Sequence, residues 1–271
     1  MNIISIDIGS STTKMILCSD GKIKSKKILR KIYEESDLEK FLKENQINII
    51  DKIIYTGIGS DKIHKTKFNI PFEKVEEFNA IAAGGLYLSK KEKAIIASVG
   101  TGTALIEASK ENIKHLGGSG VGAGTLFKIC NYFLNINSFD EIFELAQKGN
   151  IEKIDLRIGD ITDKNIQTLP KDLTLSNFGK FDKDAKKEDI VLGFVNMVFE
   201  VIGMMVAFAS INSHIKDGIL IGNITTLPGV KEMLKKIELT HQIKFTIPED
   251  AEYGVALGAI ICQEGKDFLL K

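Results

Sequence analysis

The sequence predicts an α/β protein made of two lobes that face each other. A glycine- and hydroxyl-rich turn follows an apolar strand near residue 7, and the same pattern returns near residue 100. Hairpins, crossover helices and turns at the carboxyl ends of strands are typical of α/β folds that bind nucleotides. Two such units facing each other would form a nucleotide cleft between the lobes.

The first turn joins two apolar segments, 3–8 and 15–18, of which the first carries a single acid, Asp7. The turn consists of Gly9, Ser10, Ser11, Thr12, Thr13 and Lys14. Its backbone N–H groups, hydroxyls and lysine charge make an anion-binding layout. Asp7 could hold a hydrated Mg²⁺ that faces the phosphates. The alternative is an ordinary hydroxyl-rich hairpin in which Asp7 caps the turn.

The second unit spans residues 98–127 and contains two glycine clusters separated by a strand hairpin. The first cluster consists of Gly100, Thr101, Gly102 and Thr103, and the second runs over 117–124. A helix that begins near Thr125 would direct the positive end of its dipole toward the same place. A hairpin or bulge would explain one such turn, but two in one compact unit favour a nucleotide site.

The remaining periodicity predicts alternating strands and helices. A helix is expected over 36–45, with Ser36 as N-cap and Glu39 as its capping-box partner. A strand over 49–56 ends at the turn 57–60. Further helices are expected at 76–86, 126–134, 138–149, 191–211, 230–237 and 253–263, and further strands at 71–75, 218–221 and 243–247.

We expect an N-terminal ATPase lobe over 1–78 and a C-terminal ATPase lobe over 79–271. Residues 151–187 are polar and rich in lysine, which predicts a loop-rich insertion in the second lobe. Residues 191–211 are long and apolar enough for a membrane span, but Asn196 and Glu200 near the middle favour a buried helix.

Composition narrows the classes of function. The 271 residues include 36 basic and 36 acidic ones, so no broad nucleic-acid surface is expected. Cys18, Cys130 and Cys262 are isolated, which argues against disulfides, structural zinc and an iron–sulfur cluster. The chain starts directly with a predicted strand and shows no signal segment, so we expect a cytoplasmic protein without a membrane partner.

Taken together, the motifs resemble those of the superfamily that unites acetate kinase, sugar kinases, heat-shock chaperones and actin. The resemblance implies the two-lobed actin-like (ribonuclease H-like) ATPase fold. Within this superfamily the sequence most resembles type II pantothenate kinases. The specific strings are E-F-x-A at 77–80 and L-T-x-S-N-F-G at 173–179. The phosphate turns, Gly222-Asn223 and the helix 254–260 extend the resemblance over nearly the whole chain.

The resemblance implies phosphorylation of pantothenate by ATP and Mg²⁺, the first step of coenzyme A biosynthesis. Glu77 matches the family's general base, which accepts the hydroxyl proton during attack on the γ-phosphorus. Asp7 would hold the metal, mainly through water, and Lys14 would spread the phosphate charge. The implied contacts to ATP are Asp7, Gly9, Ser10, Ser11, Thr12, Thr13, Lys14, Gly100, Thr101, Gly102, Thr103, Gly122, Ala123, Gly124, Thr125, Phe127, Gly222 and Asn223. The implied contacts to pantothenate are His115, Gly117, Thr174 and Asn177.

Two positions depart from the family pattern. Asn79 stands where the family has an aspartate, and His115 stands where it has an arginine that contacts the active-site ligands. A histidine is shorter and only partly charged near neutral pH. Either His115 or the neighbouring Lys114 substitutes for the arginine, or the acceptor differs, or His115 is only a residue at a strand end.

Three other functions remain open at this point. They are another small-molecule kinase of the same fold, a non-kinase ATPase of the dehydratase-activator type, and a binding protein that has lost turnover. The scattered cysteines argue against the activator, and Glu77 argues against the inactive protein. The apolar helix over 191–211 and the family resemblance together predict a homodimer.

Overall fold

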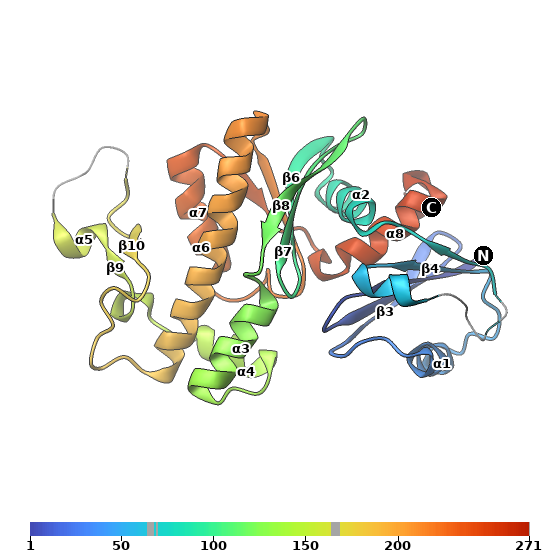
Figure 1. Ribbon diagram of the computed structural model, residues 1–271, viewed down its shortest axis with the longest axis horizontal. Coiled ribbons are helices and arrows are strands. Elements are labelled where there is room, and N and C mark those ends of the chain that lie inside the picture. The colour runs from blue at the N-terminus through green and yellow to red at the C-terminus, as the bar shows by residue number, and fades with distance from the viewer. Residues whose placement is uncertain (64–67, 69, 164–168, 271) are drawn as a thin grey trace.

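The structure, a computed structural model, describes residues 1–63, 68, 70–163 and 169–270. Two five-stranded sheets form the two lobes (Figure 1). The strand order is β3-β2-β1-β4-β5 in the first sheet and β8-β7-β6-β11-β12 in the second. In each, three antiparallel strands adjoin two parallel ones. This shared plan confirms the α/β fold of two lobes that the repeated turns predict.

The first sheet alternates its side chains between two cores, as the two-residue period of a strand requires. Ile4 and Ile6 pack with Leu38 of helix α1 on one face. On the other face, the Ser5 hydroxyl donates to the Ala256 carbonyl of helix α8 at 2.7 Å. The elements are β1 (Asn2–Ile8), β2 (Thr13–Ser19), β3 (Lys22–Leu29), α1 (Glu35–Glu44), β4 (Lys52–Thr56), β5 (Phe72–Lys74) and α8 (Gly254–Glu264).

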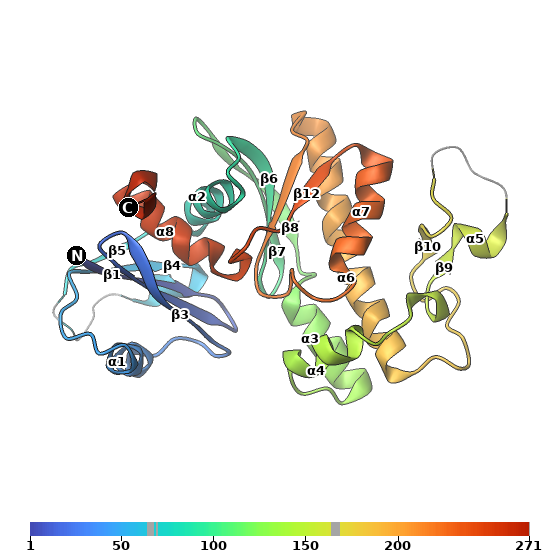
Figure 2. The ribbon, with the colours of Figure 1, turned by 180° about the vertical axis from the view of Figure 1, so that it is seen from behind.

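The second sheet is covered on one face by α6 and α7 and on the other by α2 and α8 (Figures 1 and 2). Helix α6 is long and apolar enough to cross a bilayer, but its side chains Val195, Phe199 and Ile202 are buried in the core of this lobe. The elements are α2 (Glu77–Ser89), β6 (Lys93–Val99), β7 (Thr103–Ser109), β8 (Ile113–Ser119), α3 (Ala123–Leu134), α4 (Phe139–Ala146), α6 (Lys187–Ser213), β11 (Asp217–Ile221), α7 (Val230–His241) and β12 (Lys244–Thr246).

Helices α2 and α8 cross between the two sheets at a pair of glycines (Figure 1). A Cβ atom on Gly84 would overlap the Gly254 carbonyl oxygen, and one on Gly258 would overlap the carbonyl oxygen of Ala80. The two backbones are therefore in direct contact, which only residues without a side chain permit.

The expected insertion forms a small subdomain beyond α6, on the far side from α2 (Figures 1 and 2). Residues 164–168 of this insertion lie outside the described residues. Its elements are β9 (Leu156–Arg157), α5 (Ile158–Ile161) and β10 (Thr174–Ser176), with β9 and β10 antiparallel.

The N-cap that the sequence predicts for the first helix is wrong. The cap is Glu34, and the carboxylate of Asp37 accepts the Glu34 N–H at 2.9 Å. Ser36, the predicted cap, lies inside the first turn. An acid pair three residues apart therefore starts the helix in place of the Ser36–Glu39 pair.

The helix crossing generates a prediction for stability. Gly84→Ala is expected to lower the free energy of unfolding by about 2 kcal/mol or more, because the new methyl group forces two backbones apart. Gly120→Ala is the matched control, because a Cβ atom there would meet nothing within 4 Å. Denaturant unfolding measures both. An equal effect of the two substitutions would contradict the close packing.

Candidate active site

The two glycine-rich turns line one cavity of about 410 Å³ between the lobes. This volume is in the range of small-molecule sites. The start of α2, the end of β8 and the segment 251–255 complete the wall. The predicted residues that line it are Asp7, Gly9, Ser10, Thr12, Lys14, Glu77, Gly100, Thr101, Gly102, Thr103, His115 and Gly222. Residues far apart in the chain therefore meet in the cleft that the sequence predicts.

The turns from the two lobes touch through their hydroxyl groups. Ser10 Oγ and Ser11 Oγ each lie 2.8 Å from Thr101 Oγ1. The first turn is closed by the Gly9 N–H, which donates to the Thr12 carbonyl at 2.9 Å. These hydroxyl contacts thus join the two lobes beside the predicted anion-binding site.

Asp7 and Lys14 form a buried ion pair at the base of the first turn. They are paired neighbours on the antiparallel strands β1 and β2, and Lys14 Nζ lies 2.9 Å from Asp7 Oδ2. Both side chains are almost fully buried but line the cavity. The site therefore has a fixed positive and a fixed negative charge side by side.

Glu77 is the first residue of α2 and lies in the same cavity as this ion pair. Burial, followed by the negative charge of Asp7, raises the pKa of the Glu77 carboxyl above its ordinary value. The backbone N–H of Ile58 and the charge of Lys14 act in the opposite direction. A carboxylate with a raised pKa is a better proton acceptor than an ordinary one.

On the opposite wall, the end of β11 approaches the end of β6. Gly222 has a φ of 127°, a conformation that favours glycine. The Oδ1 atom of the next residue, Asn223, is buried and has no hydrogen-bond partner within the described residues. An unpaired buried acceptor beside a cavity suits a ligand that supplies a donor, such as the hydroxyl or amino groups of a nucleoside.

The backbone N–H groups at the start of α3 do not have the phosphate-binding role that the sequence predicts. The N–H groups of Ala123 and Gly124 donate to the carbonyls of Gly100 and Thr101 at 2.8 and 3.0 Å. These donors hold the first glycine cluster against the helix, so they are not free to bind a phosphate. The helix also begins at Ala123, ahead of the start that the sequence predicts at 125–126.

Several other predicted site residues do not line the cavity. Thr13 is buried, and its hydroxyl donates to the Lys31 carbonyl at 3.0 Å. Thr174 and Asn177 lie in the insertion beyond α6, where Asn177 hydrogen-bonds Glu200 (Figure 1). The remaining residues outside the lining are Ser11, Gly117, Gly122, Ala123, Gly124, Thr125, Phe127 and Asn223.

The structure also adds residues that the sequence reasoning did not assign to the site. Ile58 lines the cavity next to Glu77, on the turn that follows β4. The turn at 57–60 was visible in the sequence, and its position after a strand was the available signal. Phe78 also lines the cavity and stacks on His115 with ring centroids 4.2 Å apart. Glu252 adds a charge to the wall, with no signal in the sequence.

Comparison with known proteins gives matches to a family model, to individual proteins and to solved structures. The family model described as Fumble matches residues 93–229. A type II pantothenate kinase of Bacillus anthracis is 30% identical over 211 residues, covering 73% of this chain and 74% of that protein. One from Bacillus cereus (strain G9842) is 28% identical over 232 residues, covering 81% and 83%.

Among solved structures, the chain resembles the activator of 2-hydroxyisocaproyl-CoA dehydratase from Clostridium difficile with bound ADPNP. The TM-score is 0.66 at 16% identity, and the match covers 98% of this chain and 96% of that one. At this identity the likeness shows the fold alone.

The environment of Glu77 predicts its titration. Its pKa is expected to lie above about 4.3, the ordinary value of a glutamate. Asp7→Asn is expected to lower that pKa, because the substitution removes a neighbouring negative charge. Carbon-detected NMR titration measures both, with Glu77→Gln to assign the signal. A Glu77 pKa at or below the ordinary value would contradict the proposed environment.

Proposed function

This chain belongs to the Fumble family, whose curated members include the type II pantothenate kinases that match it, and from that premise we propose that it phosphorylates pantothenate with ATP. The product is 4′-phosphopantothenate, and the reaction opens coenzyme A biosynthesis. The observation that carries the proposal is the family match together with a half-buried carboxylate, Glu77, beside the two glycine-rich turns.

In the proposed mechanism, Glu77 accepts the proton of the acceptor hydroxyl as its oxygen attacks the γ-phosphorus. Phosphoryl transfer needs mostly positioning and charge stabilisation, so one oriented base and a cradle of donors suffice. Lys14 and the turns around Gly9 and Gly102 supply the positive charge and the donors. The raised pKa of Glu77 supports this role, because it brings the carboxyl closer to the working pH.

We propose that Mg²⁺ accompanies the nucleotide and that Asp7 is its main protein contact, through water. Within the described residues no group of three or more His, Cys, Asp or Glu side chains could enclose a metal. This fits Mg²⁺, which keeps several waters and binds through one or two carboxylates and the phosphates. The bound ion would offset the charge of the phosphates during transfer.

We further propose a homodimer that forms through the exposed face of α6. Val201, Phe208 and Ile211 are 38%, 56% and 57% exposed, a large apolar area for a helix surface. Strand β10, which begins at Thr174, lies beyond α6 and away from the chain's own cavity (Figures 1 and 2), and Asn177 hydrogen-bonds Glu200 of α6. If Thr174 and Asn177 contact pantothenate, a second copy is the natural place for that contact. We place the enzyme in the cytoplasm.

The proposed activity predicts ADP release that depends on pantothenate. Glu77→Gln is expected to reduce this rate by about 100-fold or more, the usual scale for a positioned base, while ATP still binds. A coupled ADP assay measures turnover and equilibrium dialysis measures ATP binding.

Two results would contradict this activity. ADP release that is equal with and without pantothenate would favour an ATPase without an acceptor. Release stimulated only by pantetheine, a sugar or an amide would favour a kinase for another small molecule. Glu76→Gln, one residue before the helix, is the matched control for the effect of the substitution on folding.

The proposed dimer predicts that Phe208→Glu shifts the protein to a monomer. A charge at this exposed apolar position would have to be buried in the interface without a partner. Analytical ultracentrifugation at micromolar concentration measures the change. Ile49→Glu is the matched control, because Ile49 is 70% exposed on the other lobe. A monomeric wild-type protein would contradict the proposal.

A further inference from the structure

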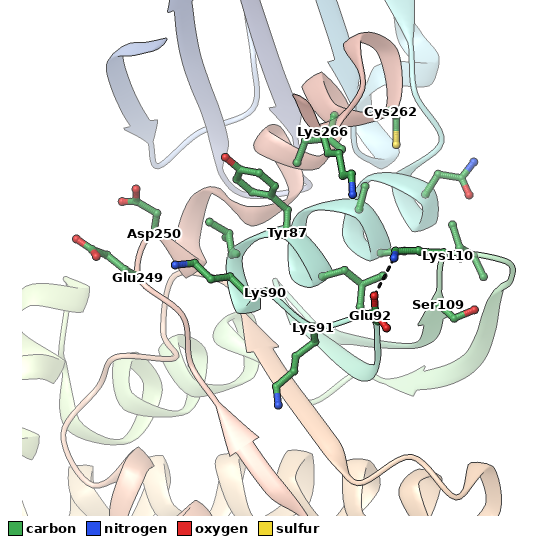
Figure 3. Close-up of a pocket in the computed structure, with 17 residues that line it drawn as sticks. Tyr87, Lys90, Lys91, Glu92, Ser109, Lys110, Glu249, Asp250, Cys262 and Lys266 are labelled. Atoms are coloured by element: carbon green, nitrogen blue, oxygen red, sulfur yellow. Dashed lines mark hydrogen bonds and ion pairs between the residues drawn. The ribbon is translucent and has the colours of Figure 1, made fainter. Parts of the chain in front are cut away.

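A second cavity, of about 740 Å³, runs along the outer face of α2 (Figure 3). It shares no lining residue with the cavity between the glycine-rich turns. Asn79, Ala83 and Leu86 are three or four residues apart on α2, so they lie on one face of the helix and form the floor. We call this cavity the α2 groove.

The walls of the α2 groove are apolar near the floor. Ile261 and Cys262 of α8 line one wall, and Ile113 of the β7–β8 hairpin lines the other. Ile113 is 40% exposed. A ligand that covers these side chains gains about 25 cal/mol for each Å² of apolar surface removed from water.

The rim of the α2 groove is basic. Lys266 reaches over α2 from the segment after α8, and Lys110 projects from the hairpin toward Glu92 (Figure 3). Lys110 pairs with Glu92 at 2.8 Å, with both side chains largely exposed. Such a surface pair contributes little, so Lys110 can exchange partners at small cost.

The balance of charge around the groove favours an anion. Of the three acids that line it, Glu92 pairs with Lys110 and Asp250 pairs with Lys26 from outside the groove. Among the described residues, Lys90 and Lys266 form no ion pair within 4 Å, and neither does Glu249. By ion pairs within 4 Å, two lysines thus stand against one acid, and Lys266 also acts through its charge on Glu92, whose pKa Lys110 and Lys266 both lower.

We propose that the α2 groove is a second binding site, for an amphipathic anion with an unbranched apolar chain and one terminal carboxylate. The chain lies on Ala83, Leu86 and Ile113, and the carboxylate lies between Lys110 and Lys266. Helix α2, which forms the floor, carries Glu77 at its first residue, so this site and the cleft share an element.

Cys262 provides a direct readout of binding. It is the exposed cysteine on the wall of the groove, whereas Cys18 and Cys130 are fully buried. The apolar surroundings raise the pKa of the Cys262 thiol, so its alkylation is followed at mildly alkaline pH. The rate of reaction with iodoacetamide is measured by intact-protein mass, with and without dodecanoate below its micelle concentration.

Dodecanoate at about ten times its Kd is expected to slow this alkylation about tenfold. Dodecanol and dodecyltrimethylammonium, which have the same chain and no negative charge, are expected to protect Cys262 less than dodecanoate does at the same concentration. The double variant Lys110→Glu/Lys266→Glu is expected to lose the protection. Lys40→Glu/Lys43→Glu, a matched charge reversal on α1, is expected to keep it.

The alkylation rate without ligand checks that each variant keeps the groove intact. Three results would overturn the proposal. They are no protection by dodecanoate, equal protection by the alcohol or the cation, and full protection in the Lys110→Glu/Lys266→Glu variant. Because the assay needs no catalysis, its outcome is independent of the proposed kinase activity.

Discussion

The direct contact between α2 and α8 is the constraint on which the cleft depends. Gly84 and Gly258 allow the two helix backbones to touch, and these helices are the layer between the two sheets. Any side chain at either glycine would thicken that layer and move the sheets apart. The contacts of Ser10 and Ser11 with Thr101, at 2.8 Å, require the lobes at their present separation. The close crossing of α2 and α8 therefore helps to keep the two lobes at the separation that the cleft requires.

Within the cleft, the charged side chains of Asp7, Lys14, Glu77 and Glu252 share a small volume. Burying the Asp7–Lys14 pair costs desolvation, so the pair is better explained by function than by stability. The pair is neutral overall, which leaves Glu77 and Glu252 as the additional charges of the lining. Nucleotide phosphates would add negative charge and would raise the pKa of Glu77 further. A bound divalent cation would reverse this shift. The Mg²⁺ ion that we propose would therefore act on the pKa of Glu77 as well as on the charge of the phosphates.

The fold was predictable because its signals are local. A glycine- and hydroxyl-rich turn after an apolar strand is legible in a few residues, and its repetition near Gly100 reveals the second lobe. The features that could not be predicted depend on contacts between residues that are far apart in the sequence. Whether the N–H groups of Ala123 and Gly124 bind a phosphate or the carbonyls of Gly100 and Thr101 is decided by how the turn packs on α3. In the same way, the first helix offered two overlapping capping patterns, and propensity does not choose between them.

The position that a motif takes in the folded molecule is harder still to predict from the sequence. The string that contains Thr174 and Asn177 is specific as a sequence, yet it folds against α6 and away from the cavity. The order of motifs along a chain identifies its family. It does not show whether a motif contributes to the cavity of its own chain or to that of a second copy. Ile58 shows the converse, since a turn without a recognised motif lies beside Glu77, the proposed base.

His115 links this chain's departure from its family to the chemistry of the cleft. Its ring lies nearly parallel to Phe78, at an interplanar angle of 15°, so Phe78 covers one ring face and the nitrogen atoms stay at the ring edge. A guanidinium at the same place would offer a planar fork of five donors. In the complex with pantothenate that we propose, a stacked imidazole would therefore offer the acceptor fewer hydrogen-bond donors than a guanidinium. The affinity for such an acceptor would then come from other parts of the wall, among them the stacked rings of Phe78 and His115.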